Sequence, residues 1–151
     1  MSRASARELA VHLIYGREFT GEEPSQVIAT RLSKEYFANL SAECEIYSQR
    51  PNSYEQAYLD KVVSGVANRA EELNETISKY SIGWDISRIS KLTRTVLQLA
   101  IFEILYLDDV PEGVAISEAV RIAKLYDGDD TGAFVNGILG TFIRNLSSEV
   151  E

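Results

Sequence analysis

The sequence predicts an all-α protein. Apolar residues recur at three- and four-residue steps along almost the whole chain, and no stretch shows the two-residue alternation of a strand. Glycine and proline are sparse, at nine and three in 151 residues, so few positions interrupt a helix. We therefore expect about seven helices, divided into an N-terminal group over about residues 1–82 and a C-terminal group over about 83–151.

The first predicted helix runs over about residues 3–19. Ser2 is a suitable N-cap, because its hydroxyl can accept a hydrogen bond from a backbone N–H of the first turn. Gly21 is a natural end, because glycine readily adopts the left-handed conformation that closes many helices. The apolar stripe that would face the core consists of Ala6, Leu9, Ala10, Leu13 and Ile14.

Three more helices are predicted in the N-terminal group. One begins after Pro24, and its apolar positions recur every four residues. Residues 41–52 are polar and predict a loop. The pattern Ser53-x-x-Gln56 predicts a capping box at the start of the next helix, and a further helix around 70–77 continues the same apolar periodicity.

The C-terminal group follows a break around Trp84 and contains three predicted helices. The helix over about 89–107 is apolar on most sides, which predicts a central position among the others. Two further helices follow Pro111. Between them, the acidic stretch 127–132 contains two glycines and predicts a flexible turn.

Composition and charge indicate a soluble cytoplasmic protein. No run approaches the roughly 20 apolar residues that span a bilayer, and the N-terminus carries Glu8 and lacks the apolar segment of a secretory signal. The single cysteine, Cys44, cannot form an internal disulfide. The formal net charge of −8 opposes phosphate, so any nucleic-acid site should be small, local and completed by a partner.

The sequence predicts no catalytic centre, cofactor site or metal site. The only histidine, His12, falls away from the apolar stripe of its helix, so we expect it to be solvated. Cys44 lies in a polar stretch between Glu43 and Glu45, so we expect no reactive thiol there. No phosphate-binding loop or hydrolase motif is present, and the aspartates of 127–130 lack the ligand spacing of a calcium loop. We therefore expect a non-enzymatic protein.

Five blocks of sequence carry a resemblance to a known family. They occur in this order: 6–10 with 13–15; 62–66; Trp84; 97–104; and 114–126 followed by 134–139. Together they resemble the NusB family, the all-helical RNA-binding factors of bacterial transcription antitermination. The resemblance implies two small helical bundles packed into a single domain of residues 1–151.

The resemblance also implies an RNA-binding site. In NusB proteins the first helix carries an arginine-rich motif that contacts boxA RNA, and Arg3, Arg7 and Tyr15 match that motif by position. Phe134 matches a phenylalanine that lies beside the RNA. Arginines would pair with phosphates and aromatic rings would stack on bases. From the residues alone, the same side chains fit surface arginines, a half-buried tyrosine and a buried phenylalanine.

The implied function is transcription antitermination in ribosomal RNA synthesis. The chain would bind boxA-type RNA together with NusE, a small-subunit ribosomal protein, and would then join elongating RNA polymerase. A basic partner suits an acidic chain. The family's arginine cluster is thinner here, which favours an alternative: a protein-interaction scaffold or homodimer of the same fold with weak or lost RNA binding. The RNA-binding end of an RNA cytosine methyltransferase fits less well, because no cofactor-binding motif is present.

Overall fold

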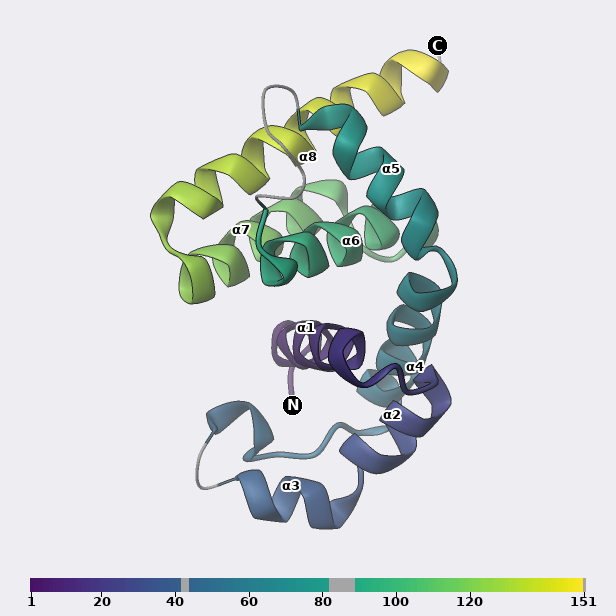
Figure 1. The fold of residues 1–151 in the computed structure, drawn as a ribbon, viewed down its shortest axis with the longest axis vertical. Helices are drawn as coiled ribbons and strands as arrows, with labels where there is room; N and C mark the ends of the chain where they lie inside the picture. Colours follow the sequence, from purple (N-terminus) through teal and green to yellow (C-terminus); the bar gives the residue numbers. More distant parts are fainter. Residues whose placement is uncertain (42–43, 82–88, 151) are drawn as a thin grey trace. The chain divides into compact units, whose positions relative to one another are not determined.

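The computed structural model describes the chain except for residues 42–43, 82–88 and 151 (Figure 1). Over the described residues the regular structure is entirely helical, which confirms the predicted all-α class. There are eight α-helices and one short 3-10 helix in this part of the chain: α1 (Arg3–Thr20), α2 (Pro24–Arg31), α3 (Lys34–Leu40), η1 (Glu45–Tyr47), α4 (Ser53–Asn68), α5 (Ala70–Tyr80), α6 (Lys91–Tyr106), α7 (Glu112–Asp127) and α8 (Asp129–Val150).

The helices form two compact units. Met1–Asn68 contains α1 to α4 with η1, and Arg69–Glu151 contains α5 to α8. Helix α5 falls within the range predicted for the N-terminal group, but it contacts α6 and α8 and lies in the second unit. The predicted break around Trp84 lies outside the described residues. A single domain over 1–151 stays a prediction.

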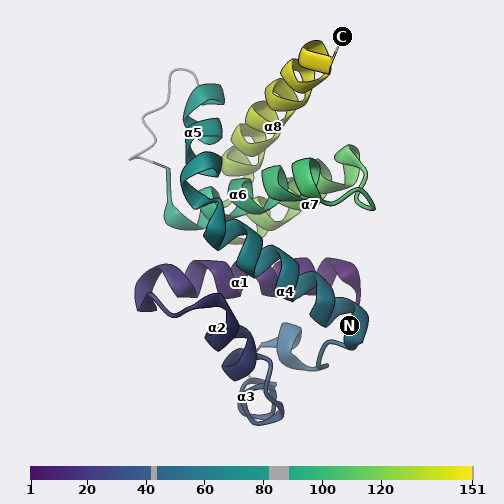
Figure 2. The same cartoon turned by 90° about the vertical axis from the view of Figure 1, so that its right-hand side faces the viewer.

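In the first unit, α1 packs against α4 and α2, and α1 lies alongside α4 in Figure 2. Both predicted ends of α1 are confirmed. The Ser2 hydroxyl accepts a hydrogen bond from the Ser5 N–H at 3.0 Å, and Gly21 adopts a φ of 69° while its N–H donates to the Arg17 carbonyl. The predicted apolar stripe of α1 is buried, and α1 packs against α4, whose Leu59, Val62, Val63 and Val66 are also buried.

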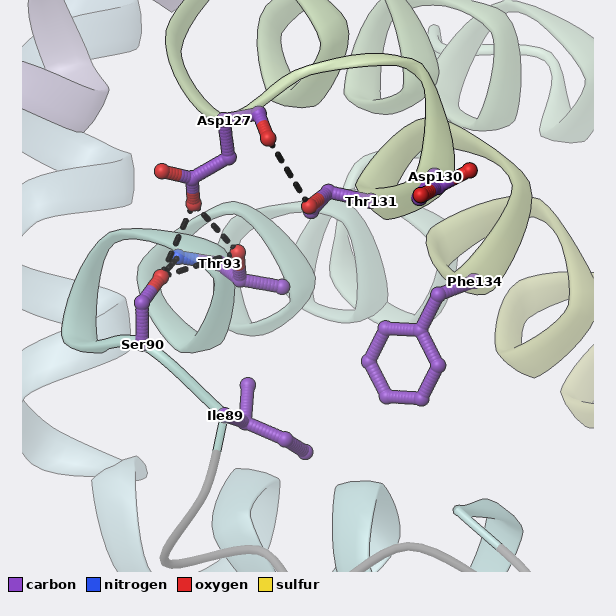
Figure 3. Close-up of a pocket in the computed structure, with 7 residues that line it drawn as sticks. All are labelled: Ile89, Ser90, Thr93, Asp127, Asp130, Thr131 and Phe134. Carbon is purple, nitrogen blue, oxygen red and sulfur yellow. Dashed lines mark hydrogen bonds between the residues drawn. The ribbon is translucent and has the colours of Figure 1, made fainter.

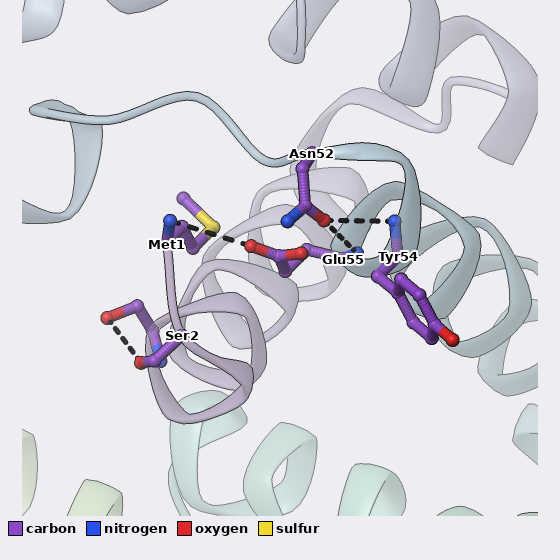
Figure 4. A network of polar contacts seen from close by, with 6 residues as sticks. Met1, Ser2, Asn52, Tyr54 and Glu55 are labelled. Atoms are coloured by element: carbon purple, nitrogen blue, oxygen red, sulfur yellow. Dashed lines mark hydrogen bonds and ion pairs between the residues drawn. The ribbon is translucent and has the colours of Figure 1, made fainter.

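The start of α4 differs from the predicted capping box at Ser53. Asn52 is the cap, because its side-chain oxygen accepts hydrogen bonds from the N–H groups of Tyr54 and Glu55 at 2.9 and 3.1 Å (Figure 4). The N–H groups of the first helical turn therefore donate to Asn52, one residue before the predicted cap at Ser53. The Glu55 carboxylate in turn lies 3.5 Å from the Met1 amine, and both groups are nearly buried.

The single helix predicted after Pro24 is in fact two helices. Ser33 separates α2 from α3, because its hydroxyl accepts a hydrogen bond from the Tyr36 N–H at 3.2 Å and starts a new helix. The predicted loop after α3 contains η1, which buries Tyr47. The Tyr47 ring makes edge contacts with Phe37 and Tyr36, at centroid distances of 5.1 and 5.9 Å.

In the second unit, α6 contacts α5, α7 and α8 and is buried along most of its length, which confirms its predicted central position. The predicted flexible turn at 127–132 is wrong. Helix α7 ends at Asp127 and α8 begins at Asp129, so Gly128 alone connects them, with a φ of 93°. Most of the predicted turn is instead the first turn of α8. No helix in the described part of the chain is long and apolar enough to cross a membrane.

Candidate nucleic-acid interface

Arg3 and Arg7 lie one turn apart on α1 and both approach one aromatic ring of α4. Their guanidinium carbons lie 4.5 and 5.9 Å from the centre of the Tyr58 ring. Cations within about 6 Å of a ring centre are attracted to its negative face. Tyr58 is only 4 % exposed, so its ring is held in the interior of the unit and both guanidinium groups pack against it.

The two arginines differ in what they can offer a phosphate. Arg7 is 4 % exposed, although the sequence alone is consistent with a surface arginine. Arg3 is partly exposed. A guanidinium that keeps solvent-facing N–H groups can form the paired hydrogen bonds that phosphate accepts. Arg3 is therefore the better placed of the two for direct contact, and Arg7 adds positive charge one turn further along α1.

Tyr15 is half-buried on α1 and makes an edge contact with Phe19, at a centroid distance of 5.1 Å and an interplanar angle of 76°. Phe19 is 61 % exposed. Tyr15 lies eight residues after Arg7, which is about 12 Å along a helix. Sequence reasoning did not select Phe19, although its four-residue spacing from Tyr15 places the two rings on one face of the helix.

Phe134 lies in the second unit, on the second turn of α8, and is half-buried. It borders a cavity of about 350 Å³ and a second one of about 630 Å³. Figure 3 shows its ring projecting into the smaller cavity toward Ile89. The ring is thus neither enclosed in the core nor wholly exposed, and open space beside it can admit a flat partner.

The smaller cavity is polar and acidic opposite Phe134. The Asp127 carboxylate accepts hydrogen bonds from the Ser90 and Thr93 hydroxyls at 2.8 and 2.6 Å, which ties the end of α7 to the start of α6 (Figure 3). Asp130 and Thr131 complete the polar lining. Carboxylates repel phosphate, so this cavity suits an uncharged ring with N–H groups rather than an anion.

The structure therefore places three of the four predicted site residues on one helix. Arg3, Arg7 and Tyr15 follow each other along α1, whereas Phe134 belongs to the other unit. Arg3 and Arg7 are brought together by their shared contact with Tyr58, which sequence reasoning missed because that contact joins two helices. The convergence of all four residues on one surface stays a prediction.

His12 differs from the solvated residue that the sequence predicted. Its ring is half-buried and makes an edge contact with Tyr47 of η1 at 6.4 Å. Burial lowers the pKa of His12, and the nearby Glu8 carboxylate partly offsets that shift. His12 is half-buried because η1, which is distant in the sequence, packs against this side of α1. Among the described residues, no three histidine, cysteine or acidic side chains are placed to hold a metal.

Comparison with known proteins identifies the family. A model of the NusB family matches residues 4–144. The chain belongs to the NusB family. The transcription antitermination protein NusB of Acetivibrio thermocellus is 40 % identical over 144 residues, covering 95 % of this chain and 90 % of that protein. The NusB protein of Symbiobacterium thermophilum is 34 % identical over 146 residues, covering 97 % of this chain and 92 % of that protein.

Solved NusB structures share the fold. The structure of T. maritima NusB matches with a TM-score of 0.76 and 27 % identity, covering 93 % of this chain and 89 % of that one. A structure of the antitermination factors NusB and NusE in complex with dsRNA matches with a TM-score of 0.73, covering 95 % and 96 %. Its identity of 23 % makes it evidence for the NusB fold alone. The resemblance drawn from the sequence blocks is thereby confirmed.

Proposed function

We propose that this NusB-family chain is a transcription antitermination factor that binds boxA-type RNA together with NusE and joins elongating RNA polymerase in ribosomal RNA transcription. The observation that carries the proposal is the family match over residues 4–144, together with relatives named as transcription antitermination proteins along nearly the whole chain. A NusB of the same fold forms a complex with NusE and dsRNA. The protein acts by binding, without catalysis, in the cytoplasm where transcription takes place.

The proposed RNA-binding residues are Arg3, Arg7, Tyr15 and Phe134. Arg3 supplies the direct phosphate contact, because it is partly exposed and its guanidinium is held over the Tyr58 ring. Arg7 strengthens the local positive field from its nearly buried position. The rings of Tyr15 and Phe134 are half-buried, so each keeps an exposed part on which a base can stack.

The charge of the chain explains why a second protein belongs in the mechanism. A net charge of −8 repels RNA at long range, and the arginines at the start of α1 oppose that repulsion locally. A basic protein bound near α1 reverses the local field and adds phosphate contacts of its own. We propose NusE as that protein.

The test is a set of RNA titrations with and without NusE at one fixed ionic strength. NusE should raise the affinity for boxA-type RNA by about tenfold or more, which is roughly 1.4 kcal/mol of coupling, and RNA should raise the affinity for NusE by the same factor. Equal RNA affinity in both titrations would remove NusE from the mechanism. A scrambled RNA of equal length is the control for charge alone.

A second function is favoured by one observation. Arg7 is nearly buried, which leaves Arg3 as the more accessible arginine of the thinned motif. The alternative is a protein-interaction scaffold or homodimer of the same fold with weak or lost RNA binding. Absence of RNA binding both with and without NusE, together with a dimer in sedimentation equilibrium, would favour this alternative over the antitermination factor.

A further inference from the structure

A separate cavity lies within the first unit, at the C-terminal half of α1. Its volume is about 220 Å³, and α1, α2, α3 and η1 all contribute to its wall. It lies away from the arginines at the start of α1, because Arg17 follows Arg7 by ten residues, or about 15 Å of helix. The polar side chains that line it are His12, Arg17, Thr20, Glu22, Arg31, Tyr36 and Tyr47.

The charges in this cavity do not cancel. Arg31 is neutralised by Glu22, since its Nη2 lies 2.9 Å from the Glu22 carboxylate, and its guanidinium lies 5.4 Å from the centre of the Tyr36 ring. Arg17 has no such counterpart, and its Nε is buried without a hydrogen-bond partner in the described part of the chain. Two arginines and one glutamate leave the lining with a net charge of +1.

The remaining polar groups of the lining are uncharged and do not oppose an anion. Burial raises the pKa of Tyr47 to about 12, so its hydroxyl stays protonated at neutral pH. Burial also lowers the pKa of His12, which keeps the imidazole neutral there. A buried, unsatisfied guanidinium donor in an otherwise neutral cavity is a costly arrangement unless a polar occupant satisfies it.

We propose that this cavity binds a small phosphate-type anion, either inorganic phosphate or a small phosphate monoester, with Arg17 as its principal ligand and Arg31 as its second. A guanidinium presents its N–H groups in a planar fork that matches phosphate oxygens. The volume of about 220 Å³ corresponds to roughly seven waters at about 30 Å³ each, which admits phosphate with a short substituent and is too small for a nucleotide chain.

The only histidine of the chain makes the proposal directly measurable. Because His12 lines the cavity, its imidazole NMR signals report on the occupant without ambiguity of assignment. Titration with inorganic phosphate at constant ionic strength should shift these signals along a saturable curve. Chloride in place of phosphate should leave them unshifted, and an equal response to chloride would overturn the proposal.

Arg17→Gln removes the charge and retains a polar side chain. This variant should bind phosphate at least tenfold more weakly, whereas Lys34→Gln, which removes an exposed charge of α3 outside the lining, should bind it as the parent does. Equal phosphate affinity in the Arg17→Gln variant and the parent would overturn the proposal. If Arg17→Gln does not fold, Arg31→Gln takes its place, and unchanged affinity there has the same meaning.

The source of the phosphate group is decided by competition. A boxA-type RNA without terminal phosphates should not displace inorganic phosphate from the cavity, and Arg17→Gln should retain the RNA affinity of the parent. Displacement by RNA would overturn the assignment of a separate small-anion site and place the cavity on the RNA surface. RNA affinity is measured independently of phosphate, so failure of the phosphate site leaves the proposed antitermination function standing.

Discussion

The guanidinium carbon of Arg3 lies 4.5 Å from the centre of the Tyr58 ring. This contact joins the first turn of α1 to the middle of α4, so the interior of the first unit determines where the arginine points. An arginine fixed in this way loses less side-chain entropy when it binds a phosphate than one that moves freely. In the proposed RNA site, this orientation would partly compensate for the small number of arginines.

Arg3→Ala should weaken RNA binding and reduce the slope of log affinity against log salt by about one, because one phosphate contact releases about one counterion. The measurement is RNA affinity across a series of salt concentrations. Arg144→Ala, which removes an exposed arginine of α8, is the matched control. An unchanged salt slope in the Arg3→Ala variant would show that Arg3 does not touch the RNA backbone.

Tyr15→Ala and Phe134→Ala should each cost roughly 1–3 kcal/mol of RNA-binding free energy, because each ring would stack on a base. The control is Tyr54→Ala, since Tyr54 is an aromatic residue of α4 that is 82 % exposed and lies outside the proposed site. RNA affinity at one fixed salt concentration is the measurement. If either variant binds as tightly as Tyr54→Ala, its stacking role is wrong.

Asp127→Ala should lower the free energy of unfolding by about 1 kcal/mol, because the Ser90 and Thr93 hydroxyls lose a charged acceptor. Urea unfolding measures this difference. Asp108→Ala, which removes an exposed aspartate of the loop after α6, should have little effect. Equal stability of the two variants would mean that the connection between α6 and α7 contributes nothing measurable.

His12 should make stability depend on pH near neutrality. Because burial lowers the pKa of His12 in the folded state, the unfolded chain binds more protons once the pH falls below the ordinary value of 6.5. The free energy of unfolding should therefore decrease as pH falls from about 7.5 to about 5.5, and His12→Gln should remove that part of the decrease. Parallel pH profiles for the parent and His12→Gln would contradict the inference.

Local signals in the sequence predicted the elements that local physics controls. The hydroxyl of Ser2 and the conformational freedom of Gly21 act within one turn, and both ends of α1 were predicted from them. The apolar residues on most sides of α6 likewise predicted its central position. Two helix starts were predicted wrongly. Asn52 caps α4 in place of Ser53, and Ser33 starts a helix inside a continuous apolar pattern.

The candidate site was predicted less completely, because its geometry depends on contacts between helices. Family resemblance selected Arg3, Arg7, Tyr15 and Phe134, but no spacing along the chain indicates that Arg7 is nearly buried. The same limit applies to His12. Its position on an isolated helix predicts solvent, whereas its ring contacts Tyr47 of η1, more than thirty residues later in the sequence.

The single-residue connection at Gly128 also determines where a distant side chain points. A side chain at this position would be strained, because the φ of 93° is a conformation that other residues rarely adopt. Phe134 lies six residues further on, about 9 Å along α8, so a rotation of about 10° at the connection would move its ring by roughly 1.5 Å. The backbone conformation of Gly128 therefore helps to set the position of a ring about two turns away along α8. Replacement of Gly128 should shift the Phe134 ring, although the substituted side chain would lie at a distance from it.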